Sequence, residues 1–209
     1  QYASLFAGTP YKVTTVYLTG EPSAEVERES ASDEVIFLNY RSIDIRGLKL
    51  KAIGDIKRLV ARRDFAFCIA HRFKPIYIAL LGTNLPVIGV HHGFGDYVRR
   101  SRRLFANFYK SRLSLLGVSN AVRDEIRSCL PGWSQERILT LYNRIDIDAV
   151  RAGQLPREAA REFLGLPKDA WIVGNVGRLH PDKDQTTLIK GFARALPGQR
   201  VPSGRPQSL

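Results

Sequence analysis

The sequence predicts an α/β protein with a Rossmann-like, doubly wound parallel sheet, followed by the start of a second Rossmann-like domain. Three observations carry this prediction. Apolar segments of strand length alternate with amphipathic segments of ~10–15 residues. The run FAFCIA at residues 65–70 is continuously apolar and too short for a helix, which is typical of a strand covered on both faces. The alternation stops at residues 143–153 and then restarts.

The elements of the first domain follow from residue type and spacing. β-branched and aromatic residues fill residues 13–19 before a Gly-Glu-Pro turn, which predicts a strand. Between residues 48 and 63, apolar residues recur at helical spacing among lysines and arginines, which predicts an amphipathic helix. The remaining strands are predicted at residues 35–38, 65–70, 87–90, 113–117 and 137–142. The remaining helices are predicted at residues 75–81 and 96–112, and after Ser119 as N-cap.

The pattern restarts after the crossover at residues 143–153. Residues 157–164 are predicted as a short helix that ends at Gly165. Residues 170–176 (AWIVGNV) are predicted as a buried strand, and residues 182–196 as a helix. We therefore expect domains at residues 1–145 and 146–196, with an irregular tail at residues 197–209.

Composition excludes several classes of protein. Of the 209 residues, 44% are hydrophobic and 25% charged, which is ordinary for a globular protein, and no apolar run approaches the ~18 residues that span a bilayer. Cys68 and Cys129 support neither a disulfide framework nor a four-ligand zinc site. Because no export signal is visible, a reducing, cytoplasmic location is expected. The sequence has no methionine, even at position 1, and this predicts a fragment.

The net charge of +12 indicates an anionic partner. Residues 97–112 contain no acid and interleave basic with aromatic side chains, which predicts a basic amphipathic helix that faces an anionic membrane. Two other interpretations are a solvated helix face and a nucleic-acid-binding module, although no nucleic-acid motif accompanies the helix. The residues predicted to face the membrane are Arg99, Arg100, Arg102, Arg103, Lys110 and Arg112.

A second basic feature lies in the turn after the strand predicted at residues 170–176. Gly177 lets a ligand approach the backbone, and the following helix would present unpaired N–H groups. Arg178 offers a bidentate guanidinium and Lys183 a compact charge, which together suit a diphosphate. The alternative is that both basic residues pair with Asp182 and Asp184 on a solvated loop. No Walker-type phosphate loop is present.

Histidines follow two of the predicted strands. His92 and Gly93 follow the strand at residues 87–90, and His71 follows the strand at residues 65–70. Since ligands of a parallel sheet bind at the carboxyl ends of its strands, His92, His71 and Gly93 are candidate ligand-binding residues. Each histidine also has an ordinary structural interpretation. Adjacent histidines at 91 and 92 face opposite ways, so they are not a metal pair, and no metal site is expected.

The run GNVGRLHPDKDQTTLIKGFARAL resembles the start of the C-terminal domain of retaining glycosyltransferases of family 4, which have the two-domain GT-B fold. Three upstream segments are similar to the same family: IAHRFKPIYIALLGTNLPVIGVHHG, LLGVSNAVRDEI and ILTLYNRIDID. The likeness covers residues 11–196 and is closest to enzymes of the lipopolysaccharide or cell-envelope type.

The resemblance implies a function and roles. The chain would transfer a sugar, with retention, from a nucleotide sugar to a glycan or lipid-linked acceptor, without a cofactor or metal ion. Arg178 and Lys183 would hold the donor diphosphate. His92 would lie near the reacting sugar as the candidate catalytic residue, with His71 and Gly93 on the sugar or acceptor side. The first domain would bind the acceptor and the second the nucleotide sugar. Membrane attachment would be peripheral, at the inner face.

The sequence departs from the family in two ways. Arg144 stands where the crossover usually has glycine. The family's first strand with its glycine-rich loop would precede Gln1, and its carboxylate pair would follow Leu209, so the fragment is expected to be inactive by itself. Another GT-B enzyme, such as a sugar-nucleotide epimerase or a phosphorylase, is the alternative enzyme class.

Overall fold

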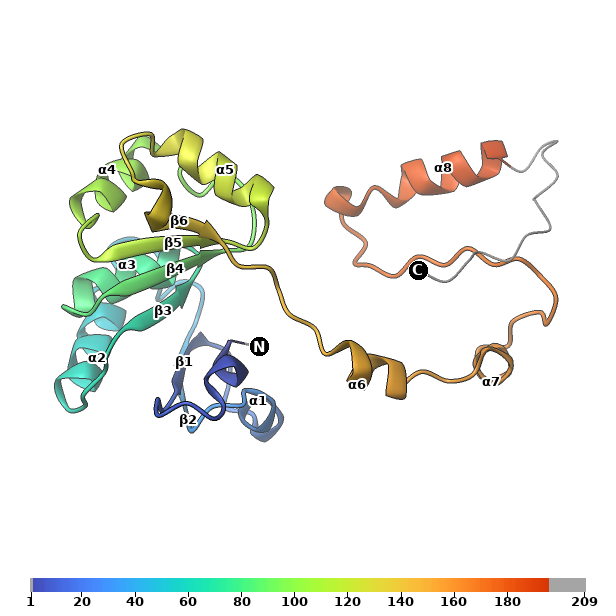
Figure 1. Ribbon diagram of the computed structural model, residues 1–209, viewed down its shortest axis with the longest axis horizontal. Helices are drawn as coiled ribbons and strands as arrows, with labels where there is room; N and C mark the ends of the chain where they lie inside the picture. The colour runs from blue at the N-terminus through green and yellow to red at the C-terminus, as the bar shows by residue number, and fades with distance from the viewer. Residues whose placement is uncertain (1, 196–209) are drawn as a thin grey trace. The chain divides into compact units, whose positions relative to one another are not determined.

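The computed structural model describes residues 2–195, and the chain divides into two units (Figure 1). The first unit ends at Asp146, and the second begins at Ile147. Residue 196 of the helix predicted at 182–196, and the tail predicted at residues 197–209, lie outside the described residues.

The first unit contains two parallel sheets. One pairs β1 (Thr14–Thr19) with β2 (Glu34–Tyr40). The other has four strands whose order follows the chain: β3 (Cys68–His71), β4 (Val87–His91), β5 (Leu113–Gly117) and β6 (Ile138–Thr140). All pairs in this second sheet are parallel, so the carboxyl ends of its strands share one edge. The α/β fold class with parallel, Rossmann-like sheets is confirmed.

Helices connect the strands. They are α1 (Ala24–Glu29), α2 (Leu50–Ala61), α3 (Phe73–Gly82), α4 (Arg100–Phe108) and α5 (Asn120–Cys129). Two 3-10 turns, Ala3–Phe6 and Gln135–Arg137, complete the unit. As predicted, Ser119 caps α5, and its hydroxyl accepts a hydrogen bond from the Val122 amide at 3.2 Å. The helix predicted at 96–112 is shorter than expected.

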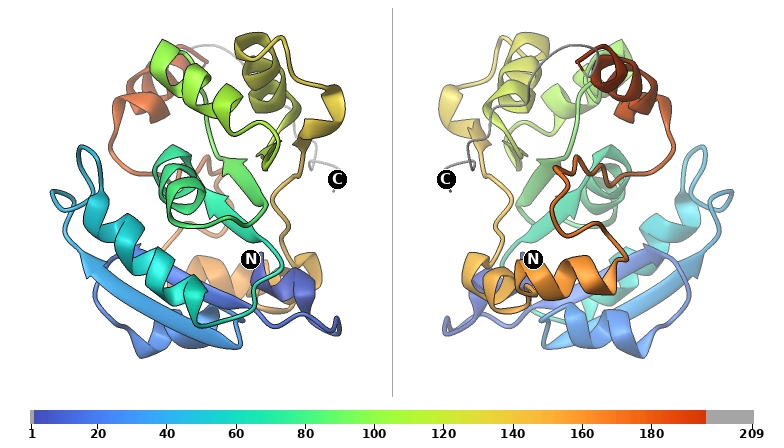
Figure 2. Two further views of the ribbon diagram at one scale, coloured as in Figure 1. Left: turned by 90° about the vertical axis from the view of Figure 1, so that its left-hand side faces the viewer. Right: turned by 90° about the vertical axis from the view of Figure 1, so that its right-hand side faces the viewer.

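Helices α3, α4 and α5 supply one core beside the four-stranded sheet (Figures 1 and 2). This placement follows from the strand order, because right-handed crossovers between successive neighbouring strands put their helices on the same face. Ile76 of α3, Leu115 of β5 and Ile126 of α5 are fully buried there. The packing requires a glycine at position 89, since a Cβ there would lie 2.5 Å from Cδ1 of Ile76.

A smaller core connects β2 to the helices. Tyr40 of β2, Ala52 of α2 and Ile78 of α3 are buried together. The hydroxyl of Tyr40 donates a hydrogen bond to Asp55 of α2. Helix α2 packs against α3, so the apolar stripe that predicted α2 is buried against its neighbours.

The second unit contains α6 (Ile147–Ala152), α7 (Arg157–Phe163), a 3-10 turn (Pro181–Lys183) and α8 (Gln185–Ala195). The strand predicted at residues 170–176 is wrong: these residues form no strand, and Trp171 and Val176 are exposed. A strand needs a hydrogen-bonded neighbour, and the described part of this unit contains no other strand.

Candidate functional site

Two histidines meet at the carboxyl edge of the four-stranded sheet. His71 is the last residue of β3, and His92 directly follows β4. Nδ1 of His71 lies 2.9 Å from Nε2 of His92, with 5.2 Å between the ring centroids and 27° between the ring planes. The ring of Tyr2 packs edge-on against His71 at 4.6 Å. Parallel pairing of β3 with β4 therefore brings together two residues that are 21 apart in the sequence.

Both of these histidines favour the neutral form. Burial and, to a smaller extent, the neighbouring His92 together lower the pKa of His71 to about 4. Burial also lowers the pKa of His92, as do the charges of Arg72 and His91. At neutral pH the contact is consequently a hydrogen bond between two uncharged rings, one donating and the other accepting.

His91 points the other way, into the core. It is fully buried; its Nδ1 lies 2.7 Å from Oδ2 of Asp96, and its Nε2 lies 3.2 Å from the hydroxyl of Tyr97. Arg102 donates to Oδ1 of Asp96 at 2.9 Å. Burial by itself would raise the pKa of Asp96, but the hydrogen bond from His91 and the charge of Arg102 lower it overall. This network ties the loop after β4 to the start of α4.

Arg72 is a residue at this edge that sequence reasoning missed. Its backbone has φ 69° and ψ 166°, a region that glycine alone adopts readily, and its amide donates to the carbonyl of Val90 at 2.7 Å. Its charge acts on His92. The sequence gives no signal of this conformation, because an arginine between His71 and Phe73 carries no turn signature.

Gly93 leaves space beside His92. A Cβ at this position would meet nothing within 4 Å, so a ligand could approach the backbone here. The contact between His91 and Asp96, on the core side, holds the loop that carries His92 and Gly93. The loop is therefore fixed by the core and accessible to a ligand at Gly93.

The second candidate site lies in the other unit. Gly177 and Lys183 are close, since a Cβ at Gly177 would lie 3.8 Å from Cγ of Lys183. Gln185 donates from Nε2 to the carbonyl of Arg178 at 2.7 Å and so holds the turn. Both basic side chains belong to exposed residues, and among residues 2–195 neither forms an ion pair.

The acidic residues of this turn have other partners. Oδ2 of Asp182 lies 3.1 Å from Nδ1 of His180, and Oδ1 of Asp184 accepts from the amide of Thr187 at 3.3 Å. The alternative that these acids neutralise Arg178 and Lys183 is therefore not what the structure has. One expectation is corrected as well: the start of α8 is not left with free N–H groups throughout, because the Asp184 carboxylate caps it.

The basic residues predicted to face a membrane divide into two groups. Arg99 and Arg100 are exposed, and Arg103 is half-buried. Lys110 and Arg112 lie beyond the end of α4. Arg112 donates to the carbonyls of Leu80 and Thr83, at 2.8 Å and 2.9 Å. Its role is thus to hold the chain between α3 and β4, which corrects its assignment to an outward basic face.

Two further predicted members of this basic face also have internal partners. Arg102 pairs with Asp96, and its guanidinium lies over the ring of Phe73 at 4.5 Å. Lys110 donates to the carbonyl of Gly132, although its residue is exposed. The outward charge of α4 therefore comes from Arg99, Arg100 and Arg103.

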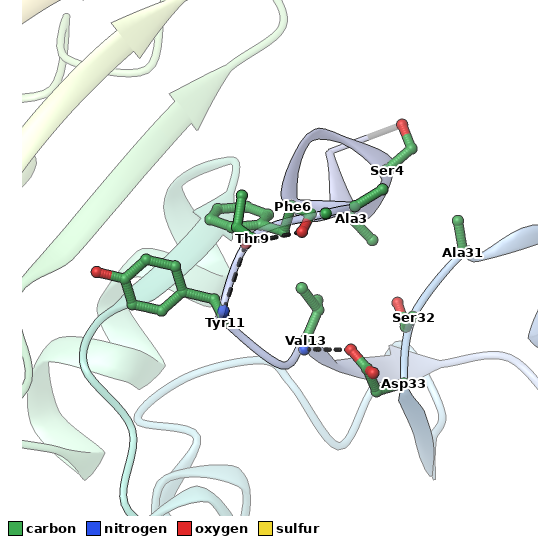
Figure 3. A pocket seen from close by; sticks show the side chains of 11 residues that line it. Ala3, Ser4, Phe6, Thr9, Tyr11, Val13, Ala31, Ser32 and Asp33 are labelled. Carbon is green, nitrogen blue, oxygen red and sulfur yellow. Dashed lines mark hydrogen bonds between the residues drawn. The ribbon is translucent and has the colours of Figure 1, made fainter.

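A cavity of about 340 Å³ opens near the N-terminal end of β1 (Figure 3). Phe6, Tyr11 and Asp33 contribute to its lining, and Oδ2 of Asp33 accepts from the amide of Val13 at 2.7 Å. None of the predicted site residues lines it. It adjoins the amino ends of β1 and β2, whereas the histidines stand at the carboxyl ends of β3 and β4.

Within residues 2–195, no three side chains of histidine, cysteine, aspartate or glutamate gather in a way that could hold a metal ion. No helix in the same range is long and apolar enough to cross a membrane.

Several curated glycosyltransferases are similar to part of the chain. The chain is 35% identical over 109 residues to the D-inositol 3-phosphate glycosyltransferase of Mycolicibacterium smegmatis, an alignment that covers 52% of this chain and 22% of the relative. It is 39% identical over 80 residues to the proteins of the same name from Mycobacterium bovis and Mycobacterium tuberculosis, covering 37% of this chain and 16% of each relative. The alignments thus span about a fifth of these relatives. No family model and no solved structure matches the chain.

Proposed function

We propose that the chain is part of a glycosyltransferase that moves a sugar from a nucleoside-diphosphate sugar to a glycan or lipid-linked acceptor, with retention at the anomeric carbon. The observation that carries the proposal is the 35–39% identity to proteins named as glycosyltransferases. The two sites described above supply the chemistry that such a transfer needs, an anion-binding turn and a polar group at a sheet edge. Synthesis of lipopolysaccharide or another cell-envelope polysaccharide is the proposed setting.

The turn at Gly177 is the proposed donor-phosphate site. The departing nucleoside diphosphate gains negative charge in the transition state, and Arg178 and Lys183 would stabilise that charge without a metal ion. Both residues are exposed and have no ion pair in the described chain, so no internal partner has to be displaced. The Asp184 carboxylate already caps the start of α8. The side chains of Arg178 and Lys183 would therefore contribute more to anion binding than the backbone amides of α8.

The sheet edge at His92 is the proposed sugar or acceptor side. The residue His92 is exposed, although partial burial of its ring lowers its pKa. The absence of a side chain at Gly93 leaves the backbone next to His92 accessible. A neutral imidazole can donate to or accept from a sugar hydroxyl. We therefore assign the contact with the reacting sugar to His92. His71 and Gly93 would line the same sugar or acceptor site.

The outward face of α4 is proposed to dock on an anionic membrane, at the inner side of the cell membrane. Arg100, Leu104 and Phe108 recur every four residues and so share one face of the helix. Leu104 and Phe108 are 71% and 79% exposed, which is unusual for such large apolar side chains next to a well-packed core. Apolar side chains flanked by arginines suit the boundary between headgroups and acyl chains.

Nucleotide binding tests the donor site directly. We expect UDP, GDP or ADP, titrated into the 209-residue chain and followed by amide NMR shifts, to perturb the residues around Gly177 and α8. Each charge-assisted hydrogen bond is worth ~1.5–3 kcal/mol, so Arg178→Ala should weaken binding at least about tenfold. Lys190→Ala, which removes an exposed charge on α8, is the matched control and should leave binding unchanged. Equal affinity of Arg178→Ala, Lys183→Ala and the parent would contradict the donor site.

A further inference from the structure

The contact between His71 and His92 restricts the protonation of both rings. With Nδ1 of His71 and Nε2 of His92 2.9 Å apart, only one of these two nitrogens carries a proton at neutral pH, since two protons would clash and none would leave two lone pairs opposed. In a neutral imidazole, the proton on one nitrogen decides the state of the other. The tautomers of the two rings are therefore coupled: both rings carry their proton on Nδ1, or both carry it on Nε2.

The same contact also restricts the direction of the His92 ring. His92 lies in the loop after β4 and is exposed, so packing alone holds its ring weakly. His71 belongs to a strand, is half-buried, and has the ring of Tyr2 against it. The hydrogen bond thus connects an exposed loop side chain to one fixed by the sheet.

We infer that His71 is a positioning residue: through its Nδ1 atom it fixes the ring orientation of His92 and couples the tautomer of His92 to its own, and so fixes which nitrogen His92 presents to a sugar hydroxyl. This inference rests on the proposed function for the identity of the ligand. Within the described chain, Nδ1 of His92 has no hydrogen-bond partner, so it is the nitrogen left to face the ligand.

The electrostatic surroundings agree with a neutral pair. The charged or titratable neighbours that act on His92 are Arg72 and His91, and both oppose a positive charge on its ring. The pKa of His71, at about 4, keeps that ring uncharged at neutral pH. A neutral His92 would act as a hydrogen-bonding group rather than as a cation.

The experiment is nitrogen-15 NMR of the histidine side chains in the 209-residue chain, which reports the protonation of each ring nitrogen. We expect the two rings in the parent to carry their protons on matching nitrogens, both on Nδ1 or both on Nε2. His71→Leu keeps the bulk but removes the partner, and the two His92 resonances should shift because the tautomer of His92 no longer depends on residue 71. His71→Asn keeps a polar group near the position of Nδ1 and should restore most of the parent spectrum.

The amide spectrum of each variant shows whether the fold is intact, and the parent spectrum tests the inference if His71→Leu does not fold. Opposite tautomers of His71 and His92 in the parent would overturn the inference, as would unchanged His92 nitrogen resonances in a folded His71→Leu variant. Neither readout requires a nucleotide or sugar transfer. Failure of the nucleotide titration with success of this test would therefore remove the proposed function and leave the positioning role in place.

Discussion

Nδ1 of His91 lies 2.7 Å from Oδ2 of Asp96, and this contact joins a fully buried imidazole to a half-buried carboxylate that also pairs with Arg102. Because His91 ends β4 while Asp96 precedes α4, the contact closes the loop between them. The adjacent His92 is thereby directed away from the core, toward the edge that it shares with His71. One histidine supports the loop, and its neighbour is available for chemistry.

Removal of this carboxylate should destabilise the first unit. Asp96→Ala leaves the buried Nδ1 of His91 without its partner and Arg102 without its ion pair, and an unsatisfied buried group costs ~1–3 kcal/mol. The free energy of unfolding, from urea denaturation at pH 7, should fall by that amount. Asp124→Ala removes an exposed carboxylate whose partner Arg123 is its neighbour in sequence, and it should change the free energy by less than ~1 kcal/mol.

The loss of unfolding free energy caused by Asp96→Ala should become smaller at low pH. The pKa of Asp96 is lowered in the folded state, so its stabilisation is fully present above the unfolded value of about 4 and is lost as the pH falls through the folded pKa. The difference between the parent and Asp96→Ala should therefore narrow when the denaturation is repeated at pH 3. A difference that stays constant from pH 7 to pH 3 would show that the charge of Asp96 is not what stabilises the loop.

Arg112 should prove to be a structural residue. Its guanidinium donates to the carbonyls of Leu80, Thr83 and Leu85, which end α3 and lead into β4. Arg112→Ala should lower the free energy of unfolding by ~1.5–3 kcal/mol, and Arg112→Lys should recover only part, because an ammonium cannot span three carbonyls in a plane. Arg99→Ala, at an exposed position, is the control. Equal stability of the Arg112 and Arg99 variants in urea would contradict this role.

The limits of sequence reasoning appear in particular residues. The positions of His71 and His92 at strand ends predicted that they would share an edge of the sheet, because parallel strands have their carboxyl ends at the same edge. The hydrogen bond between the two rings depends on the register of β3 with β4, and this register cannot be predicted from the local sequence. Helix α1 was not predicted, since its six residues show no apolar repeat and only Ser23 marks its start. Residues 170–176 have the composition of a strand but no partner in the described part of their unit.

Arg112 shows a different limit. In the sequence it belongs to a basic run and is indistinguishable from Arg99 or Arg100. Its partners are carbonyls 27 to 32 residues earlier in the chain, so only the tertiary fold separates a structural arginine from an outward one. The predicted basic face is consequently smaller than the charge run suggested, and the exposed apolar residues of α4 become more important to it.

The membrane proposal predicts salt-dependent binding to anionic vesicles through the outward face of α4. Each arginine near an anionic surface contributes ~1 kcal/mol, and exposed charges are screened beyond ~8 Å at physiological ionic strength. The parent should therefore sediment with phosphatidylglycerol vesicles at low salt, less at high salt, and weakly with neutral phosphatidylcholine. Replacement of Arg99, Arg100 and Arg103 by glutamine should release it.

Two further variants separate this docking from net charge alone. Replacement of Arg28, Arg46 and Lys57 by glutamine removes the same charge from exposed positions outside α4 and should leave most binding intact. Leu104→Ser with Phe108→Ser keeps every charge but removes the exposed apolar pair, and should weaken binding because the buried apolar area is lost. If the two triple variants sediment alike, α4 is not the docking face. If single-stranded DNA or RNA displaces the protein from vesicles at far lower concentration than soluble anionic lipid does, the surface serves a nucleic acid instead.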